Sequence, residues 1–265
     1  MINRDMKKTK IIATLGPASS SRETMIEMIK EGVDVFRINF SHADYDLVKK
    51  NVELIRSINK EYGFNTAILG DLQGPKLRVG VVKEGSFINP GDILTFTNEN
   101  VEGDASRVYM TYERFAKDVK VGERILIDDG KLVFEVIETN QKDIVKAKAI
   151  QGGPLSSKKG VNLPNTAISL PALTEKDIED AKFMLDNEFD WIALSFVRHA
   201  QDIKDLKDLI QNHTNGKQNT PIIAKIEKPE GVENMDEILR ECDGIMVARG
   251  DLGVEIPMEE VPVVQ

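Results

Sequence analysis

Polar side chains recur two residues apart near the end of a segment that otherwise reads as a β-strand. In residues 34–41, Arg37, Asn39 and Ser41 fall at i, i+2 and i+4, so we expect the three side chains to leave one face of the strand. A parallel strand covered by helices is normally apolar on both faces, and this polar face therefore favours a role in binding. An exposed edge strand with alternating polarity is the alternative explanation.

The same spacing returns in the second half of the chain. Lys225 and Glu227 share one face of a predicted strand at residues 222–227, and Asp251 ends the next predicted strand at 244–251. Two carboxylates on neighbouring strand ends, with a lysine beside them, form the oxygen-rich pocket that Mg²⁺ or Mn²⁺ prefers, with positions left open for substrate oxygens. A Lys225–Glu227 salt bridge that only caps the sheet is the alternative.

Further basic groups stand in segments with turn signals. Arg78 follows a Gly74-Pro75 turn, and its planar guanidinium suits phosphate oxygens. Lys158 and Lys159 precede a glycine, where a flexible loop could reach a polyphosphate. A solvated basic turn is the alternative for this pair, and it is the interpretation we prefer for Lys158.

The elements that must position these groups alternate in type. Strand-like runs are separated by amphipathic segments such as residues 44–61, a pattern typical of βα units and a parallel sheet. Strands are predicted at residues 10–15, 34–40, 66–71, 191–197, 222–227 and 244–251. A closed (β/α)₈ barrel needs eight strands, so we expect an α/β chain with an incomplete TIM-type barrel. An open doubly wound sheet is the alternative.

The alternation is interrupted after the third predicted strand. Between residues 76 and 165 the helical period disappears, and short Val-, Ile- and Phe-rich runs are divided by turn signals. We predict an inserted all-β, barrel-like lid domain. The expected division is residues 1–75 for the first three barrel strands, 76–166 for the lid (the "inserted domain" below), and 167–265 for strands four to six.

Composition narrows the class of partner. The 265 residues carry a net charge of −9, which argues against nucleic-acid binding. No apolar run is long enough to span a membrane, and the start lacks the apolar core of a signal peptide. The single cysteine, Cys242, cannot form an intrachain disulfide, which fits a reducing cytoplasm.

Several long segments, taken together and in order, resemble the pyruvate kinase family. The resemblance covers essentially the whole chain, including the interruption of the barrel by a β-rich lid. The matching segments are Phe36-Arg37-Ile38-Asn39-Phe40-Ser41-His42, Asp71-Leu72-Gln73-Gly74-Pro75-Lys76-Leu77-Arg78, Lys159-Gly160-Val161-Asn162-Leu163-Pro164, Ile223-Ala224-Lys225-Ile226-Glu227-Lys228-Pro229-Glu230-Gly231 and Ala248-Arg249-Gly250-Asp251-Leu252-Gly253-Val254-Glu255.

The resemblance implies transfer of the phosphoryl group of phosphoenolpyruvate to ADP, giving pyruvate and ATP in glycolysis. It makes Glu227 and Asp251 the Mg²⁺ or Mn²⁺ ligands and Lys225 the group that stabilises the phosphoryl group in transfer. Arg37 is expected to bind the substrate phosphate, and the backbone of Gly250 with the Asp251 region its carboxylate.

The nucleotide contacts implied by the resemblance lie in both parts of the chain. His42, Arg78 and Lys159 match family positions that contact the nucleotide, and Asn39 and Ser41 lie in the same region. Lys159 is expected to arrive by closure of the lid. The family also implies a cytoplasmic homo-oligomer, a tetramer.

A monovalent-cation site is the point at which this chain departs from the family pattern. K⁺-dependent members resemble Asp-Thr-Lys-Gly-Pro-Glu where this chain has Lys76 in place of the final glutamate. We expect the Lys76 ammonium to replace K⁺, which is then not required; a Lys76 that only points to solvent is the alternative. The family's K⁺ positions correspond here to Asn39, Ser41, Asp71 and the Leu72 backbone.

Two other functions stay open at this stage. One is another metal-dependent TIM-barrel enzyme that handles phosphoenolpyruvate or pyruvate enolates, for which Arg78 and a lid with Lys159 are not needed. The other is a non-catalytic remnant, although a half-buried Lys225 without transfer chemistry mainly costs desolvation. Because two barrel strands are missing from the pattern, we also expect the chain by itself to be inactive.

Overall fold

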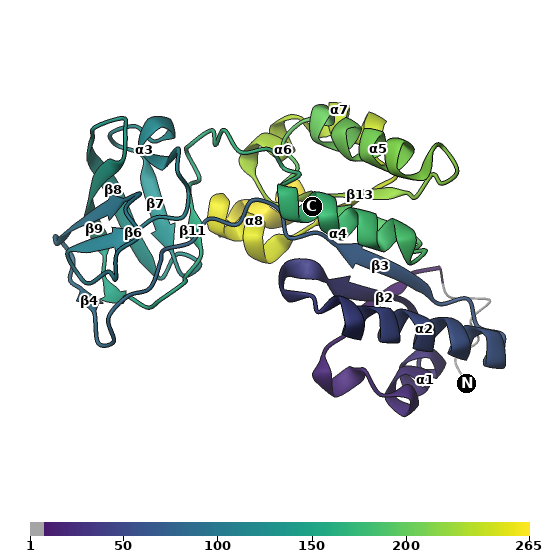
Figure 1. Cartoon of the computed structure of the whole chain (residues 1–265). Coiled ribbons are helices and arrows are strands. Elements are labelled where there is room, and N and C mark those ends of the chain that lie inside the picture. The colour runs from purple at the N-terminus through teal and green to yellow at the C-terminus, as the bar shows by residue number, and fades with distance from the viewer. Residues whose placement is uncertain (1–7) are drawn as a thin grey trace. The chain divides into compact units, whose positions relative to one another are not determined.

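The computed structural model describes residues 8–265, and their contacts separate into two compact units (Figure 1). The first unit contains the chain up to Gly74, then Ala172–Ile226 and Asn234–Met246. The second contains Pro75–Pro171, Glu227–Glu233 and Val247–Gln265.

A parallel sheet forms the centre of the first unit, in the strand order β1-β2-β3-β12-β13-β14. Neighbouring strands are related by βα connections, so their carboxyl ends meet at one edge of the sheet. The strands are β1 (Ile11–Thr14), β2 (Val33–Asn39), β3 (Ala67–Asp71), β12 (Trp191–Leu194), β13 (Ile222–Ile226) and β14 (Gly244–Val247).

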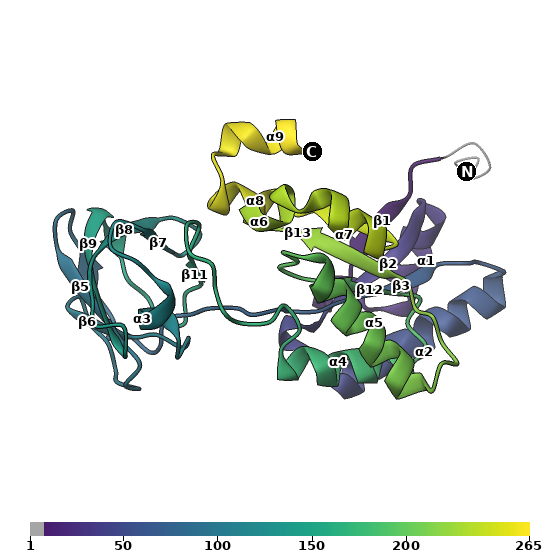
Figure 2. The same ribbon diagram turned by 90° about the horizontal axis from the view of Figure 1, so that it is seen from above.

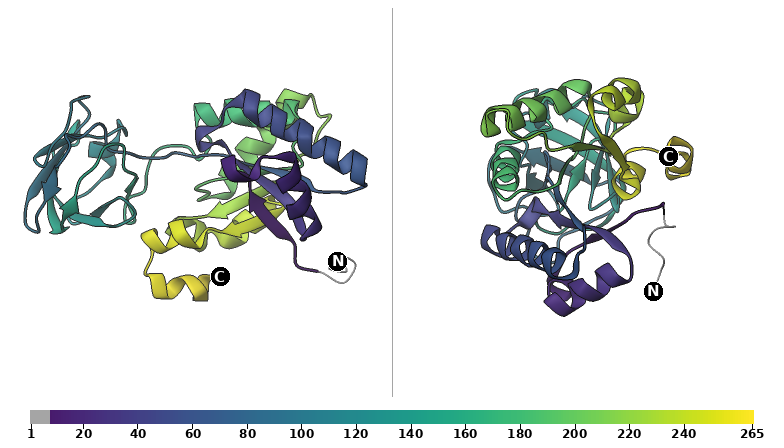
Figure 3. Two further views of the ribbon diagram at one scale, coloured as in Figure 1. Left: turned by 90° about the horizontal axis from the view of Figure 1, so that it is seen from below. Right: turned by 90° about the vertical axis from the view of Figure 1, so that its right-hand side faces the viewer.

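Amphipathic helices cover the outer side of this curved sheet (Figure 3, right). In α2 (Tyr45–Tyr62), the Asp44 carboxylate accepts the N–H groups of Asp46 and Leu47, and Gly63 ends the helix with φ +68°. The other helices of the unit are α1 (Arg22–Lys30), α4 (Glu175–Asp186), α5 (Ala200–Thr214) and α7 (Met235–Glu241), with the short 3₁₀ turns η2 (Pro17–Ser19) and η3 (Phe40–His42).

Burial differs between the middle and the margins of the sheet. Ile68 and Ile192 on the central strands are fully buried. On the outermost strands, Ile11, Ile12 and Ile245 are 43%, 45% and 40% exposed. The predicted α/β class, an incomplete TIM-type sheet with an inserted all-β domain, is confirmed.

The inserted domain has a core of its own, built on a mostly antiparallel sheet (Figure 2). Its larger sheet has the order β11-β7-β8-β9-β5-β6, and its interior contains Phe96, Phe115 and Phe134, whose rings meet edge to face. The elements are β4 (Phe87–Ile88), β5 (Ile93–Thr97), β6 (Arg107–Tyr109), α3 (Phe115–Asp118), β7 (Arg124–Ile127), β8 (Leu132–Thr139), β9 (Ile144–Gln151), β10 (Gly153–Pro154) and β11 (Val161–Asn162).

The chain leaves the first unit at a glycine that no other residue could replace without strain. Gly74 has φ +69°, and a Cβ there would lie 2.7 Å from Phe196 Cδ2. The Gly74 N–H donates to Asp177 Oδ1 at 3.0 Å, and Asp177 is fully buried. The exit from the barrel sheet is therefore fixed in both conformation and position.

The end of the chain differs from the sequence-based prediction. The segment between β13 and β14 contains two short helices, α6 (Pro229–Glu233) and α7, with Asn234 between them. β14 ends at Val247 and is followed by α8 (Arg249–Glu255), η4 (Met258–Glu260) and α9 (Val261–Val264). Within residues 8–265, no helix combines the length and apolar character needed to cross a membrane.

Candidate active site

Arg37 and Asp71 meet at the carboxyl ends of β2 and β3. The Arg37 Nε donates to Asp71 Oδ2 at 2.6 Å, and Nη2 pairs with the same oxygen. Nη1 donates to Thr14 Oγ1 at 2.8 Å. Asp71 is 1% exposed, whereas the Arg37 side chain is 25% exposed, so the guanidinium is oriented by a buried carboxylate while part of it stays accessible.

Lys225 joins the same carboxylate from β13. Its Nζ lies 3.2 Å from Asp71 Oδ1 and donates to Ser195 Oγ at 2.7 Å. The Ser195 hydroxyl in turn donates to the Leu72 carbonyl oxygen at 2.7 Å. Arg37 and Lys225 contribute two positive charges against the one negative charge of Asp71, so these three side chains have a net charge of +1. Such an arrangement attracts an anion.

Asn39 ends its strand, and Ser41 does not continue it as predicted. β2 ends at Asn39, whose Oδ1 accepts the Ser41 N–H at 3.0 Å and caps the 3₁₀ turn Phe40–His42. The predicted placement of Ser41 on the strand face is therefore wrong, because this local cap turns the chain. His42 is exposed, and Asn39 lies opposite Asp71 in the β2–β3 register.

The Leu72 region of the expected monovalent-cation site is held by backbone contacts. Leu72 is 1% exposed, and its N–H donates to the Ala193 carbonyl at 3.0 Å. Its own carbonyl accepts the Ser195 hydroxyl, as described above. Lys76, the residue expected to replace K⁺, is exposed in the second unit.

Glu227 and Asp251, the expected metal ligands, stand in different settings. Glu227 directly follows β13 and is 1% exposed. Asp251 does not end a strand but lies in the first turn of α8, where an acidic side chain is favourable. Its side chain is exposed. Gly250 precedes it, with open space where a Cβ would stand.

The carboxylate oxygens of the two expected ligands are of the kind that a hard cation prefers. Mg²⁺ is usually held by one or two carboxylates, while water and substrate phosphates complete its coordination. No group of three or more His, Cys, Asp or Glu side chains within residues 8–265 could hold a metal by itself. An ion held by Glu227 and Asp251, the two expected ligands, would need oxygens from water or a substrate to complete its coordination.

The basic groups of the inserted domain are set by turns. Arg78 Nη1 donates to the Lys158 carbonyl at 2.8 Å, and Arg78 bridges to Gly160 through the backbone. The Lys159 ammonium lies 3.0 Å from Asp128 Oδ1 and its side chain is 39% exposed. Hydrogen bonds from Lys131 and Lys159 hold the pKa of Asp128 below its usual value.

Comparison with known protein families identifies the family of this chain. The family model described as "Pyruvate kinase, barrel domain" matches residues 6–265. The chain belongs to the pyruvate kinase family.

Individual relatives agree with this assignment. A "Pyruvate kinase" of Corynebacterium efficiens is 44% identical over 260 residues, which cover 98% of this chain and 54% of the relative. "Pyruvate kinase 2" of Synechocystis sp. is 47% identical over 264 residues, covering 98% and 44%. A "Pyruvate kinase" of Clostridium perfringens is 44% identical over 262 residues, covering 98% and 55%. The chain thus spans about half the length of these pyruvate kinases.

Three side-chain contacts could not be predicted from the sequence. Thr14 and Ser195 each lie at or directly after the end of a barrel strand and bind Arg37 and Lys225 respectively. Both are polar residues at the end of an apolar run, and this position could have indicated a role at the strand ends. For Asp128, nothing in the sequence spacing indicated that it would pair with Lys159.

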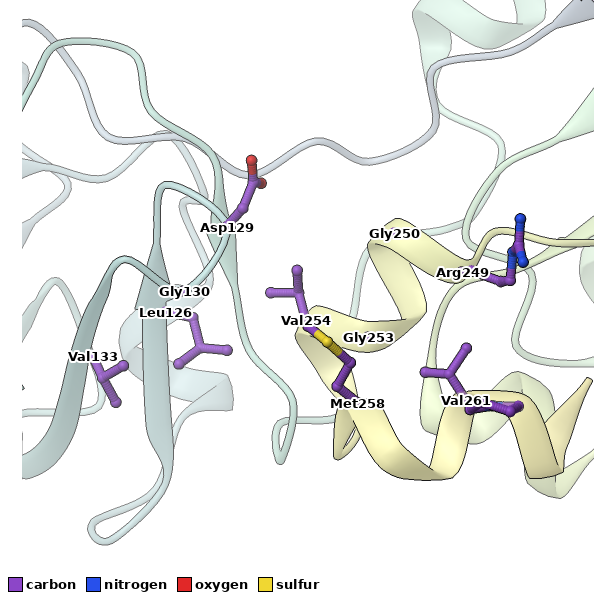
Figure 4. Close-up of a pocket in the computed structure, with 11 residues that line it drawn as sticks. Leu126, Asp129, Gly130, Val133, Arg249, Gly250, Gly253, Val254, Met258 and Val261 are labelled. Atoms are coloured by element: carbon purple, nitrogen blue, oxygen red, sulfur yellow. The ribbon is translucent and has the colours of Figure 1, made fainter.

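A hollow of about 710 Å³ lies in the second unit (Figure 4). Its lining is mainly apolar, and Asp129 and Arg249 are the charged side chains in it. The other lining residues are Leu126, Gly130, Val133, Gly250, Gly253, Val254, Met258, Val261 and Pro262. Neither Arg78 nor Lys159 lines this hollow, and its apolar walls do not suit a polyphosphate.

Proposed function

We propose that the protein containing this chain transfers the phosphoryl group of phosphoenolpyruvate to ADP. The bond between phosphorus and the enol oxygen breaks, and a bond forms to an oxygen of the ADP β-phosphate. The enolate that remains takes a proton at carbon and becomes pyruvate. The observation that carries the proposal is the bridge in which Asp71 holds Arg37 and Lys225 together at the strand ends.

The bridge gives Arg37 and Lys225 separate roles. Arg37 binds the substrate phosphate through the part of its guanidinium that stays accessible. Lys225 faces the charge that spreads over the phosphoryl oxygens during transfer, and Ser195 with Asp71 fixes its ammonium beforehand. Because these donors are already in place, little reorganisation is needed during the reaction.

Glu227 and Asp251 hold Mg²⁺ or Mn²⁺ in this proposal, and the backbone of Gly250 and the Asp251 region receives the substrate carboxylate. The ion, when bound, neutralises developing charge on the phosphoryl oxygens. Glu227 follows Lys225 by two residues, so the ligand and the catalytic lysine leave the same end of β13. The buried carboxylate supplies a fixed ligand and the exposed one a ligand open to substrate.

The nucleotide is bound by Asn39, Ser41, His42, Arg78 and Lys159 in this proposal. Arg78 and Lys159 belong to the inserted domain, residues 76–166, between the barrel parts at 1–75 and 167–265. Closure of this domain would bring Lys159 to the nucleotide and exclude water, which strengthens each charged contact.

Lys76 replaces the monovalent cation near Asn39, Ser41, Asp71 and Leu72 in this proposal, so K⁺ is not required. The protein acts in the cytoplasm as a homo-oligomer, a tetramer by family resemblance.

The test is formation of pyruvate and ATP from phosphoenolpyruvate and ADP by the full-length protein. We expect both products with Mg²⁺ or Mn²⁺ and almost none when the divalent cation is chelated. Absence of ATP with both substrates and Mg²⁺ present would overturn the proposal.

A further inference from the structure

A buried ion pair outside the site described above links two segments of the second unit. Lys228 Nζ lies 2.9 Å from Glu255 Oε1, and the two side chains are 5% and 1% exposed. Asn162 Nδ2 donates to the same Glu255 oxygen at 2.7 Å. The Lys228 ammonium also reaches the Leu163 carbonyl at 3.4 Å. Lysine and glutamate are almost never this buried unless they are paired.

Both members of this pair adjoin the proposed metal ligands. Lys228 directly follows Glu227, and Glu255 stands four residues after Asp251 in α8. Residues at i and i+4 of a helix lie on the same side, about one turn apart. The Lys228–Glu255 bond therefore ties the segment that carries one ligand to the helix that carries the other.

The anchoring of α8 supports this interpretation. Leu252 and Glu255 are buried, while Asp251 stays exposed in the first turn. The apolar contacts of Leu252 hold the helix against its surroundings but give it no directional bond. Glu255 supplies that bond, and through it the orientation from which Asp251 projects.

Stability alone does not account for the pair. Glu255 Oε2 is buried and has no hydrogen-bond partner among residues 8–265, although Oε1 has two donors. A buried ion pair can often be replaced by apolar side chains without loss of stability, so its presence is weak evidence for a stabilising role. An incompletely satisfied pair is weaker evidence still.

We propose that Glu255 is a positioning residue for the divalent-metal site, an inference that rests on the proposed function. By holding Lys228, it sets where α8 presents Asp251 relative to Glu227. Residues that orient metal ligands in this way typically change metal affinity about 10- to 100-fold when they are replaced.

The experiment is a Mn²⁺ titration of the full-length protein without substrates, followed by electron paramagnetic resonance. We expect Glu255→Gln to raise the Mn²⁺ dissociation constant about tenfold. The matched control is Glu99→Gln, which removes a carboxylate from an exposed pair with Arg107 in the inserted domain. This control should bind Mn²⁺ like the unmodified protein.

A double variant separates positioning from folding. Glu255→Gln leaves the Lys228 charge buried without its counter-ion, whereas Glu255→Gln with Lys228→Met removes both charges. We expect the double variant to recover thermal stability but to keep the weak Mn²⁺ binding. If Glu255→Gln alone does not fold, Mn²⁺ binding by the double variant tests the inference.

Two results would overturn the inference. One is unchanged Mn²⁺ affinity in folded Glu255→Gln, and the other is recovery of normal affinity in the double variant. Failure of the proposed function looks different, because the unmodified protein would then form no ATP from phosphoenolpyruvate and ADP.

Discussion

The strand ends of the barrel sheet and the basic turn of the inserted domain both carry positive charge, but they hold it differently. Arg37 and Lys225 converge on one carboxylate, Asp71, which is 1% exposed. Lys159 pairs with Asp128 on a turn, and its side chain is 39% exposed. The first arrangement is buried at the ends of the barrel strands, whereas the second lies on an exposed turn, where a ligand can replace the contact. We therefore expect substitutions at the strand ends to affect catalysis and folding together, and those in the turn to affect one ligand only.

The largest effect on stability and turnover is expected when the carboxylate at the strand ends is removed, and the same change in the turn is the comparison. Asp71→Asn leaves Arg37 and Lys225 without a buried counter-ion. We expect it to lower the free energy of unfolding by about 3–5 kcal/mol and turnover by roughly 100-fold or more. Urea denaturation and steady-state assays of the full-length protein measure both. Asp128→Asn is the control, and equal losses in the two variants would contradict the distinction.

A smaller effect is expected from the exposed lysine itself. Lys159→Ala should raise KM for ADP about tenfold, the loss of one charge-assisted hydrogen bond, while KM for phosphoenolpyruvate stays unchanged. Lys131→Ala is a matched control, because Lys131 also pairs with Asp128 but is not among the proposed nucleotide contacts. Initial-rate measurements with each substrate varied give the result. Parallel increases in both KM values would mean that the turn is not specific for nucleotide.

The junction between the two regions gives the next test. Lys76 is exposed two residues beyond Gly74, and we expect the full-length protein to work without added K⁺. Lys76→Glu should then make activity several-fold dependent on K⁺, because the fixed ammonium is lost and a carboxylate can attract the cation. Assays in tetramethylammonium buffer with KCl titrated in test both forms. Strong K⁺ activation of the unmodified protein would refute the expectation.

The smallest effect concerns how the contribution of Asp128 to the unfolding free energy depends on pH. Hydrogen bonds from Lys131 and Lys159 lower the pKa of Asp128 below its ordinary value of 3.8. Because the folded-state pKa is the lower one, this stabilisation is fully present above the ordinary pKa and is lost as pH falls through the folded value. We expect the difference in unfolding free energy between the unmodified protein and Asp128→Asn to shrink by less than about 1 kcal/mol from pH 7 to pH 3. Urea denaturation at both pH values checks this, and a difference that grows on acidification would contradict the sign.

Much of the barrel part could be predicted because its signals are local. The helix expected at residues 44–61 is observed at Tyr45–Tyr62, and the strand expected at 66–71 at Ala67–Asp71. Apolar periodicity and end signals such as Asp44 and Gly63 are sufficient for such elements.

The chemistry of the site needed long-range information. That Asp71 bridges Arg37 and Lys225 follows from the order β2-β3-β12-β13, which no local pattern specifies. Ser41 and Asp251 were misplaced for the opposite reason. Each lies in a 3₁₀ or α-helical segment that begins directly after a strand. The strand-like sequence pattern continues past the end of the strand, so the pattern alone does not mark where the strand stops.

The central claim, that the strand-end charges carry phosphoryl transfer, is tested most directly by Lys225→Met in the full-length protein. Turnover with phosphoenolpyruvate and ADP is measured beside Mn²⁺ binding, with the exposed Lys182→Met as control. We predict that turnover falls by roughly 10³-fold, while the Mn²⁺ dissociation constant stays within about twofold, because the lysine contributes no metal ligand. Near-normal turnover of Lys225→Met would contradict the account.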